Sequence, residues 1–440
     1  MASTQINYTQ GTPTDGIKYT LSMWVKRSNE GADSNYLASV WVDGSNHWCM
    51  RFITDQLDIY DNVSGSTTTE IKTTRKFRDP SAWYHIVYVY DSANVTAGDR
   101  QRLYVNGVEE TIFDVDTNPS SSYASILNVS GRDLTFGARN SASYWDGCMS
   151  HINFCDGQAY AASDFGETDS TSGLWKIKAT PSVTYGNNGF WLKMEDSSNL
   201  DLDSSGNSQS FTTTGNLTAT KDNPSNNFST WNPLVTSVGL DSPTFLNGNT
   251  FLQAASNTPK NYGVSSLAMP KTGKYFSEHK IVTNNDCIQF GICSSDDATA
   301  SFQSNTPFSS TTYGMMYVCP EGKIEYNNSN EITGLTTAGN NDIVGLAIDM
   351  DNEKMYIYVN GALVNSGGTS FASKVTGDFV YMCTGDGTTS GNDSVYSNFG
   401  NGYFGTTAIT SAGTNASNNG LFEYDVPSGF GALCTKQIDS

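Results

Sequence analysis

Short apolar runs separated by turn residues recur along the whole chain. Residues 19–26 place Leu21, Met23 and Val25 on one face of an extended segment, while Trp24 on the opposite face blurs the alternation. A period of two is typical of a β-strand with one buried face. Further strands are expected at 36–42, 47–53, 57–61, 69–74, 83–90, 101–105, 110–115, 133–137, 149–154 and 189–195. Their spacing predicts an antiparallel sandwich.

The second half of the chain has the same pattern. Strands are expected near 274–282, 286–293, 312–319, 322–327, 342–350, 354–359, 378–384 and 395–399. Asn106-Gly107 and Asn360-Gly361 each follow a β-rich segment and predict hairpins, because both central residues of a type I′ turn need positive φ. Helical spacing is scarce, and 161–165 is the best short helical segment. The predicted fold class is all-β, with two antiparallel, jelly-roll-like sandwiches in tandem.

A polar, turn-rich stretch near the middle of the chain marks the expected domain boundary. The 440 residues are too many for one hydrophobic core. All eight tryptophans lie at or before Trp231, so the two halves also differ in composition. We therefore expect a first sandwich at 1–212, a linker at 213–235 and a second sandwich at 236–440.

Charge and composition narrow the class of partner. Apolar residues make up 37% of the chain and charged residues 15%, but 12% aromatic residues supply enough apolar area for folding. The net charge of −20 repels phosphate backbones and anionic lipid, so we expect no nucleic-acid partner. No apolar run is long enough to span a bilayer, and 1–10 lacks the pattern of a secretory signal, so we expect no membrane insertion.

Several segments of the first half resemble the laminin-G or concanavalin A-like sandwich family. They are 19–26, 83–87 and 103–107. A second group resembles a version of this fold common in tailed phages of marine bacteria, and consists of 144–154, 156–159, 163–166 and 185–193. Asn226-Asn227-Phe228 and Asn232-Pro233-Leu234 match the connector of the same phage proteins.

The second half is similar to SPRY domains. The segments 273–278, 290–292, 341–349 and 354–361 carry the likeness. The combined resemblance implies a marine-phage or cyanophage-type virion protein with a laminin-G-like domain followed by a SPRY-like domain. Phage tail fibres usually carry an anchoring segment and a trimerising coiled coil or β-helix, and neither pattern is visible. A capsid decoration, knob or tail-associated appendage is therefore favoured over a complete tail fibre.

The resemblance also implies partners and a location. Other capsid or tail proteins would be the structural partners, and a host surface glycan or protein the target, while a homo-oligomer is compatible with the sequence. The expected location is the virion, assembled in the host cytoplasm. Two alternatives stay open: a secreted or virion-borne polysaccharide-active glycoside hydrolase, and a peptide-binding SPRY adaptor.

Motifs for catalysis are absent from the sequence. Laminarinase-type relatives of the concanavalin A-like class use Glu-x-Asp-x-x-Glu, which brings nucleophile and acid/base carboxylates together. Glu167-Thr168-Asp169 and Glu423-Tyr424-Asp425 come nearest, but Ser172 and Ser428 replace the second glutamate. No nucleophile elbow, zinc-protease helix or phosphate-binding loop occurs. We therefore expect no catalytic residues and no enzyme activity.

Cofactor and ligand candidates are few. Asp201 and Asp203 begin a segment like an EF-hand calcium loop, but Thr212 replaces its bidentate glutamate. Calcium is thus the one cofactor to test, and otherwise no cofactor is expected. The eight cysteines show no CxxC spacing and are expected to be reduced and buried. Four tryptophans are candidates for stacking on a sugar ring: Trp41, Trp48, Trp145 and Trp191.

Overall fold

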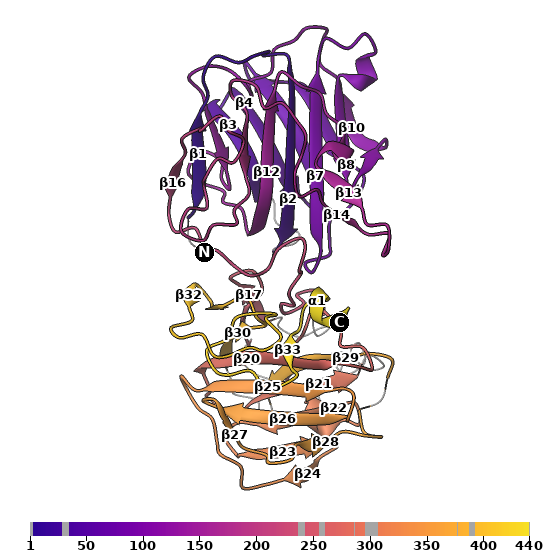
Figure 1. The fold of residues 1–440 in the computed structure, drawn as a ribbon, viewed down its shortest axis with the longest axis vertical. Helices are drawn as coiled ribbons and strands as arrows, with labels where there is room; N and C mark the ends of the chain where they lie inside the picture. The colour runs from indigo at the N-terminus through magenta and orange to yellow at the C-terminus, as the bar shows by residue number, and fades with distance from the viewer. Residues whose placement is uncertain are drawn as a thin grey trace. The chain divides into compact units, whose positions relative to one another are not determined.

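The computed structural model describes residues 3–28, 35–235, 243–254, 260–285, 287–294, 307–375, 377–386 and 392–439. The chain divides into two compact units, Met1–Ala219 (unit 1) and Thr220–Ser440 (unit 2). Figure 1 draws unit 1 in indigo to magenta and unit 2 in orange to yellow, and β-strands dominate both. The all-β fold class predicted from the strand spacing is confirmed.

Unit 1 begins with an eight-stranded antiparallel sheet. Its order is β10 (Phe113–Thr117), β6 (Ser66–Thr73), β5 (Gln56–Val63), β4 (Asn46–Ile53), β3 (Asn35–Asp43), β11 (Asp133–Phe136), β1 (Gln5–Thr9) and β16 (Thr212–Thr214). The strand that closes this sheet, β16, pairs with β1 from the start of the unit.

A six-stranded sheet packs against the first. Its order is β15 (Phe190–Leu192), β12 (Gly147–Asp156), β2 (Lys18–Arg27), β7 (Trp83–Asp91), β8 (Gln101–Val105) and β9 (Val108–Glu110). Leu21, Met23 and Val25 all lie in the core between the two sheets, whereas Trp24 faces the other way and stacks on His85. The alternation of residues 19–26 therefore sets which face of β2 points into the core between the two sheets, and the opposite face is buried as well.

A segment of irregular chain covers the outer side of the six-stranded sheet. It contains two short strands, β13 (Gly166–Thr168) and β14 (Trp175–Ile177), and the 3₁₀ turn η2 (Ala162–Asp164), while η1 (Ala97–Asp99) precedes β8. Trp175 donates from Nε1 to Nδ1 of His85 at 2.9 Å. The segment starts after Asp156, whose buried carboxylate accepts bonds from Thr14 N at 2.6 Å and Asn128 Nδ2 at 2.7 Å. Asp156, the first residue of the motif at 156–159, thus holds the end of β12 to the chain at Thr14 and Asn128.

Unit 2 is a second pair of sheets. The nine-stranded sheet runs β17 (Thr244–Leu246), β18 (Phe251–Gln253), β30 (Ser394–Asn398), β20 (Lys274–Thr283), β25 (Ile343–Asp349), β26 (Lys354–Val359) and β27 (Ala362–Leu363), with β28 (Thr369–Ser370) on β26 and β33 (Gly431–Ala432) on β20. The six-stranded sheet runs β19 (Lys260–Val264), β29 (Val380–Asp386), β21 (Ile288–Ser294), β22 (Gly314–Val318), β23 (Lys323–Tyr326) and β24 (Ser329–Ile332).

The C-terminal part of unit 2 crosses the outer side of its nine-stranded sheet. It contains the hairpin β31 (Tyr403–Phe404) and β32 (Thr407–Ala408) and ends in the helix α1 (Thr435–Ile438), while the 3₁₀ turn η4 (Phe308–Ser310) precedes β22. Glu278, fully buried on β20, accepts the backbone N–H groups of Glu423 and Tyr424 at 2.8 Å each. This carboxylate ties the crossing segment to the sheet.

The predicted linker at 213–235 is wrong over most of its length. Thr213 and Thr214 belong to β16 of unit 1, and the division between the units falls after Ala219. Phe228 and Trp231 are buried in unit 2, where the Trp231 indole donates to Ser397 Oγ at 2.9 Å. Because these apolar side chains of a turn-rich stretch pack into the core of unit 2, a polar composition alone does not identify a segment as a linker.

Two smaller expectations are also resolved by the structure. The segment 161–165 holds the single 3₁₀ turn η2, and the helix α1 lies elsewhere in the sequence. All eight cysteines are reduced, and each is buried except the half-buried Cys148. In the described part of the chain, no helix combines the length and the hydropathy that crossing a bilayer requires.

Candidate functional site: the outer face of the eight-stranded sheet

Strands β3, β4 and β5 send alternate side chains to opposite faces of the eight-stranded sheet. On β4, Trp48, Met50 and Phe52 point into the core of unit 1. His47 and Arg51 therefore point to the outer face. The strand register extends this outer face across the sheet, since Tyr36 lies opposite Arg51, Trp41 opposite His47, Asp58 opposite both Arg51 and Lys72, and Glu70 opposite Tyr60.

Two arginines pack on aromatic rings of this outer face. The Arg139 guanidinium lies 4.7 Å from the Tyr36 ring centre and 5.0 Å from that of Trp41. The Arg51 guanidinium lies 4.9 Å from the Tyr60 ring centre. Such cation–π contacts contribute about 0.5–2 kcal/mol each. We call this set, Tyr36, Trp41, His47, Arg51, Tyr60 and Arg139, the aromatic–arginine face.

Hydrogen bonds fix the same side chains. The buried Tyr36 hydroxyl accepts from Arg139 Nη1 at 2.7 Å and from Arg51 Nη1 at 3.0 Å. The Trp41 ring stacks on His47 with centroids 4.6 Å apart. Burial lowers the pKa of His47, and the charges of Arg139 and Arg51 add to this effect. Trp41, Arg51, Tyr60 and Arg139 are each half-buried, so their accessible parts form a prearranged aromatic and cationic surface.

Two carboxyl groups meet beside this surface. Asp58 and Glu70 lie near each other on adjacent strands, and Arg51 Nε lies 2.9 Å from Asp58 Oδ2. Burial raises the pKa of Asp58, against the opposing effect of Arg51. Burial also raises the pKa of Glu70, and the neighbouring Asp58 charge adds to that rise. The pattern of a single strand does not reveal this pair, because Asp58 lies on β5 and Glu70 on β6.

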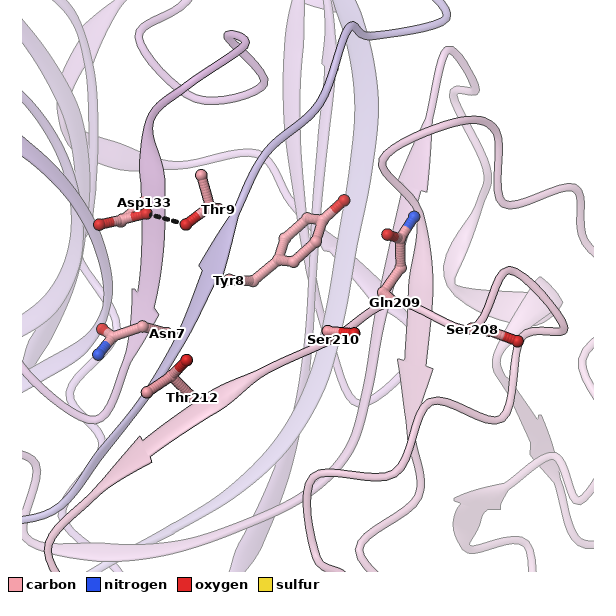
Figure 2. A pocket seen from close by; sticks show the side chains of 8 residues that line it. All are labelled: Asn7, Tyr8, Thr9, Asp133, Ser208, Gln209, Ser210 and Thr212. Atoms are coloured by element: carbon pink, nitrogen blue, oxygen red, sulfur yellow. Dashed lines mark hydrogen bonds between the residues drawn. The ribbon is translucent and has the colours of Figure 1, made fainter.

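A polar groove lies at one edge of the same sheet (Figure 2). Its volume is about 520 Å³, and it is lined by Asn7, Tyr8, Thr9, Asp133, Ser208, Gln209, Ser210 and Thr212. Figure 2 shows Thr9 and Asp133 on one side, joined by a 2.5 Å hydrogen bond, and Gln209 across from them. Hydroxyl, amide and carboxylate groups of this kind match the hydrogen-bonding groups of a polyol.

The four tryptophan candidates lie in different environments. Trp41 belongs to the aromatic–arginine face. Trp48 is 1% exposed and lies in the core, so it is excluded as a platform; the parity of β4 places its ring inward. Trp191 is 7% exposed, and Lys193 Nζ lies 4.4 Å from its ring centre. Trp145 is half-buried and packs 5.8 Å from Phe52. The structure does not gather the four into one site.

The calcium candidates act as turn-forming acceptors. Both carboxylate oxygens of Asp203 accept hydrogen bonds, from Trp191 N at 2.9 Å, from Ser205 N at 2.8 Å and from Gln209 N at 2.9 Å among others. Asp201 accepts from the Thr213 hydroxyl at 2.8 Å. Within the described ranges, no three His, Cys, Asp or Glu side chains come close enough together to hold a metal ion. The geometry gives Asp203 a structural role in place of the calcium role proposed from sequence.

Signals for the rest of the face were present in the sequence. The segments 47–53 and 57–61 alternate, and the residues between their core positions are His47, Arg51, Asp58 and Tyr60. Polar and aromatic residues on the solvent side of adjacent strands could have been grouped by that parity. Arg139 could not, because it follows β11 and reaches Tyr36 only through the sheet order.

Comparison with known families places unit 1. Residues 2–164 match the family model described as the Concanavalin A-like lectin/glucanases superfamily. The match covers the strands that carry the aromatic–arginine face, Arg139 included. A concanavalin A-like domain is consistent with a binding module for carbohydrate or protein. No curated protein matches the chain.

Three solved structures show distant likeness to the chain. The SPRY domain of human HERC1 is 17% identical, covers 38% of this chain and 96% of its own, and has a TM-score of 0.31. A heptameric SAP-like pentraxin from Limulus polyphemus is 18% identical, with 36% and 71% covered and a TM-score of 0.27. Mouse laminin α1 domains LG4-5 are 9% identical, with 98% and 85% covered and a TM-score of 0.29. At these scores the likenesses carry no argument about function.

Proposed function

We propose that the protein is a non-enzymatic binding protein whose aromatic–arginine face takes a saccharide. The observation that carries this proposal is the fixed placement of Trp41 and Tyr60 beside Arg139 and Arg51 on an accessible sheet face. Aromatic surface with a few convergent polar groups is the usual composition of a ligand site. The rings offer faces for a sugar ring, and the guanidinium N–H groups offer donors for its oxygens.

The polar groove beside β1 supports the same proposal. It lies on the same sheet, and its lining of hydroxyl and amide groups suits a hydroxylated ligand. A chain of several sugar residues would gain from both regions, because contacts at two places on one ligand raise its overall affinity. The groove is therefore a candidate for a secondary contact.

The test is binding of a polysaccharide panel to the 440-residue chain and to two variants, Trp41→Ala and Arg139→Ala. Each variant should bind the preferred glycan at least about tenfold more weakly, which corresponds to about 1.4 kcal/mol. Trp41→Phe should restore part of the affinity, and Tyr313→Ala, which removes an exposed ring of unit 2, should leave it unchanged. Equal affinity of Trp41→Ala and the parent chain would refute the assignment.

We further propose that the setting is a bacteriophage virion, where the protein displays unit 1 toward a host surface glycan or protein. The support is the resemblance to marine-phage proteins of the segments 144–154, 156–159, 163–166, 185–193, 226–228 and 232–234. A mass-spectrometric inventory of purified virions should find the chain at a fixed copy number, and negative-stain images of virions lacking it should lose a surface feature. Its absence from virions would remove this setting without affecting the glycan-binding test.

A glycoside hydrolase is the second candidate, because Asp58 and Glu70 form a carboxyl pair beside aromatic rings. Against it, both catalytic carboxyl groups of a hydrolase must reach the sugar or a water, whereas Asp58 is buried. Asp58 is 2% exposed and bonded to Arg51. Assays for reducing ends should show no turnover; sustained turnover that Glu70→Gln abolishes would favour the hydrolase.

A further inference from the structure

A cavity of about 280 Å³ remains between the C-terminal segment of unit 2 and the nine-stranded sheet. Its residues come from β20, from β30, from the hairpin of β31 and β32, and from the chain near Thr410 and Glu423. This volume lies just below the range of about 300–1,000 Å³ typical for drug-sized ligands. A ligand with a single ring would fit it.

Lys280 supplies the positive charge of this cavity. It lies between Ile343 of β25 and Tyr396 of β30 in the strand register. Among the described residues, no carboxylate lies within ion-pair distance of its ammonium group. Other lysines of unit 2 do have such partners: Lys271 with Asp378, Lys274 with Asp349, Lys323 with Glu321 and Glu325, and Lys374 with Glu331. Lys280 is therefore a half-buried cation with no ion-pair partner in the described part of the chain.

Two aromatic rings border Lys280. The Tyr396 ring packs on Phe251 with centroids 4.8 Å apart. A Cβ at Gly405 would come within 2.5 Å of Cε1 of the Tyr396 ring. The turn between β31 and β32 thus rests against Tyr396, and a glycine is required there both for space and for its φ of +64°. Phe404, 6% exposed, faces the same cavity from this hairpin. The walls are fixed in place without a ligand.

Glu423 limits what the cavity accepts. Its carboxylate bonds to Thr410 N at 2.8 Å and to the Thr410 hydroxyl, and its backbone N–H is held by Glu278. It lines the cavity but forms no ion pair with Lys280 in the described structure. A fixed negative charge near the cation disfavours a dianion such as a phosphate monoester more than it disfavours a singly charged group.

We propose that this cavity binds a small aromatic monocarboxylate, with the carboxylate on Lys280 and the ring against Tyr396 and Phe404. An ammonium–carboxylate hydrogen bond in a partly desolvated site is among the stronger polar contacts. The site belongs to unit 2 and does not depend on saccharide binding by unit 1.

The test uses benzoate as the probe, titrated into the full 440-residue chain and followed by ligand-observed NMR and calorimetry. Saturable one-site binding is expected. Lys280→Met, which keeps the apolar stem, should weaken it at least about tenfold, while Lys271→Met, at a pair whose side chains are 69% and 87% exposed, should not change it. Benzamide, which lacks the charge, and phenyl phosphate should each bind more weakly than benzoate.

Three outcomes would overturn the proposal: no saturable benzoate binding, equal affinity in Lys280→Met, or equal affinity for benzamide. Glu423→Gln gives an independent check, because removal of the fixed charge should narrow the preference for benzoate over phenyl phosphate. An unchanged preference in a folded Glu423→Gln protein would contradict the role given to Glu423. Folding of each variant is checked by its thermal unfolding.

Discussion

Unit 1 and unit 2 each contain a fully buried histidine that stacks on a tryptophan and a fully buried carboxyl group that accepts a backbone N–H group. His85 stacks on Trp24 at 4.7 Å, and His279 stacks on Trp231 at 5.5 Å. The carboxyl groups are Asp61, which accepts from Ile126 N at 3.3 Å, and Glu278. The units therefore use the same types of buried polar group despite their different sequences.

The units differ in which sheet the irregular chain covers. In unit 1 the segment after Asp156 covers the six-stranded sheet and leaves the outer face of the eight-stranded sheet accessible. In unit 2 the C-terminal segment crosses the nine-stranded sheet and leaves the cavity at Lys280. A sandwich therefore acquires an extended face or a small cavity according to the path of its connections, while the sheets themselves stay similar.

The largest expected effect concerns an ion pair that distinguishes unit 1. Arg27 and Asp55, with side chains 1% and 7% exposed, pair at 3.2 Å, and Arg27 also lies 4.5 Å from the Phe52 ring centre. Asp55→Ala should lower the free energy of unfolding of unit 1 by about 3–5 kcal/mol, because it leaves a buried guanidinium without its partner. Urea unfolding that resolves both units measures this loss. Lys271→Met in unit 2 should cause no measurable change, and an equal loss there would contradict the expectation.

The next expected effect tests the buried carboxyl groups through pH. Burial raises the pKa of Asp61 from 3.8 to about 7 and that of Glu278 from 4.5 to about 7. The folded carboxyl keeps its proton after the unfolded one has lost it, so its contribution to stability falls as pH rises from about 4 to 7. Between these pH values each group should lower the free energy of unfolding of its unit by on the order of 3 kcal/mol. Asp61→Asn and Glu278→Gln should each abolish this pH-dependent decrease in the unit that carries the substitution. Thermal unfolding across this pH range gives the result.

The histidines titrate in the opposite sense. Burial lowers the pKa of both His85 and His279 from 6.5 to about 3, so their contribution to stability is lost as pH falls from 6.5 toward 3. In the parent chain the two effects oppose each other within each unit. In His85→Gln, the free energy of unfolding of unit 1 should therefore fall with rising pH because of Asp61 alone. This variant should make unit 1 less stable at pH 7 than at pH 5. A flat profile in that variant would show that Asp61 does not titrate in this range.

The hydrogen bonds of His85 also define its tautomer. The Trp175 indole can donate but cannot accept, so Nδ1 of His85 carries no proton, and Nε2 donates to the Ser22 hydroxyl at 2.9 Å. His279 is held by hydroxyls on both sides, Ser277 at 2.8 Å and Ser397 at 2.9 Å. Both histidines thus act as packed, neutral groups, with no route to a ligand.

The smallest expected effect concerns the carboxyl pair on the aromatic–arginine face. Glu70→Gln should stabilise unit 1 by about 0.5 kcal/mol or less, because it removes repulsion from Asp58 at a group that solvent still screens. Glycan affinity should stay within about twofold of the parent value, which is near the limit of such measurements. A loss of tenfold or more would place Glu70 among the ligand contacts. Differential scanning calorimetry and the glycan titration together decide the point.

The strand pattern carried most of the fold information and little of the site. Alternation at 19–26 predicted the correct inward face, because burial of one sheet face repeats every second residue. Alternation within 47–53 could also have placed Trp48 on the same face as Met50 and Phe52, opposite to His47. The linker was misjudged because Trp231 packs in a core whose other members lie far along the chain. Arg139 and Lys280 acquire their neighbours from strand order, which single-strand patterns do not contain.

The pairing of β16 with β1 has a topological consequence for unit 1. Gln5 lies opposite Thr214, and the Thr4 hydroxyl donates to the Asn216 carbonyl at 3.1 Å, so both ends of the unit leave from one place. A module with adjacent ends can be circularly permuted or inserted into a surface loop of an unrelated host with little strain. A short bridge from Asn216 to Thr4, with new ends opened at the Ser64-Gly65 turn, would make such a graft.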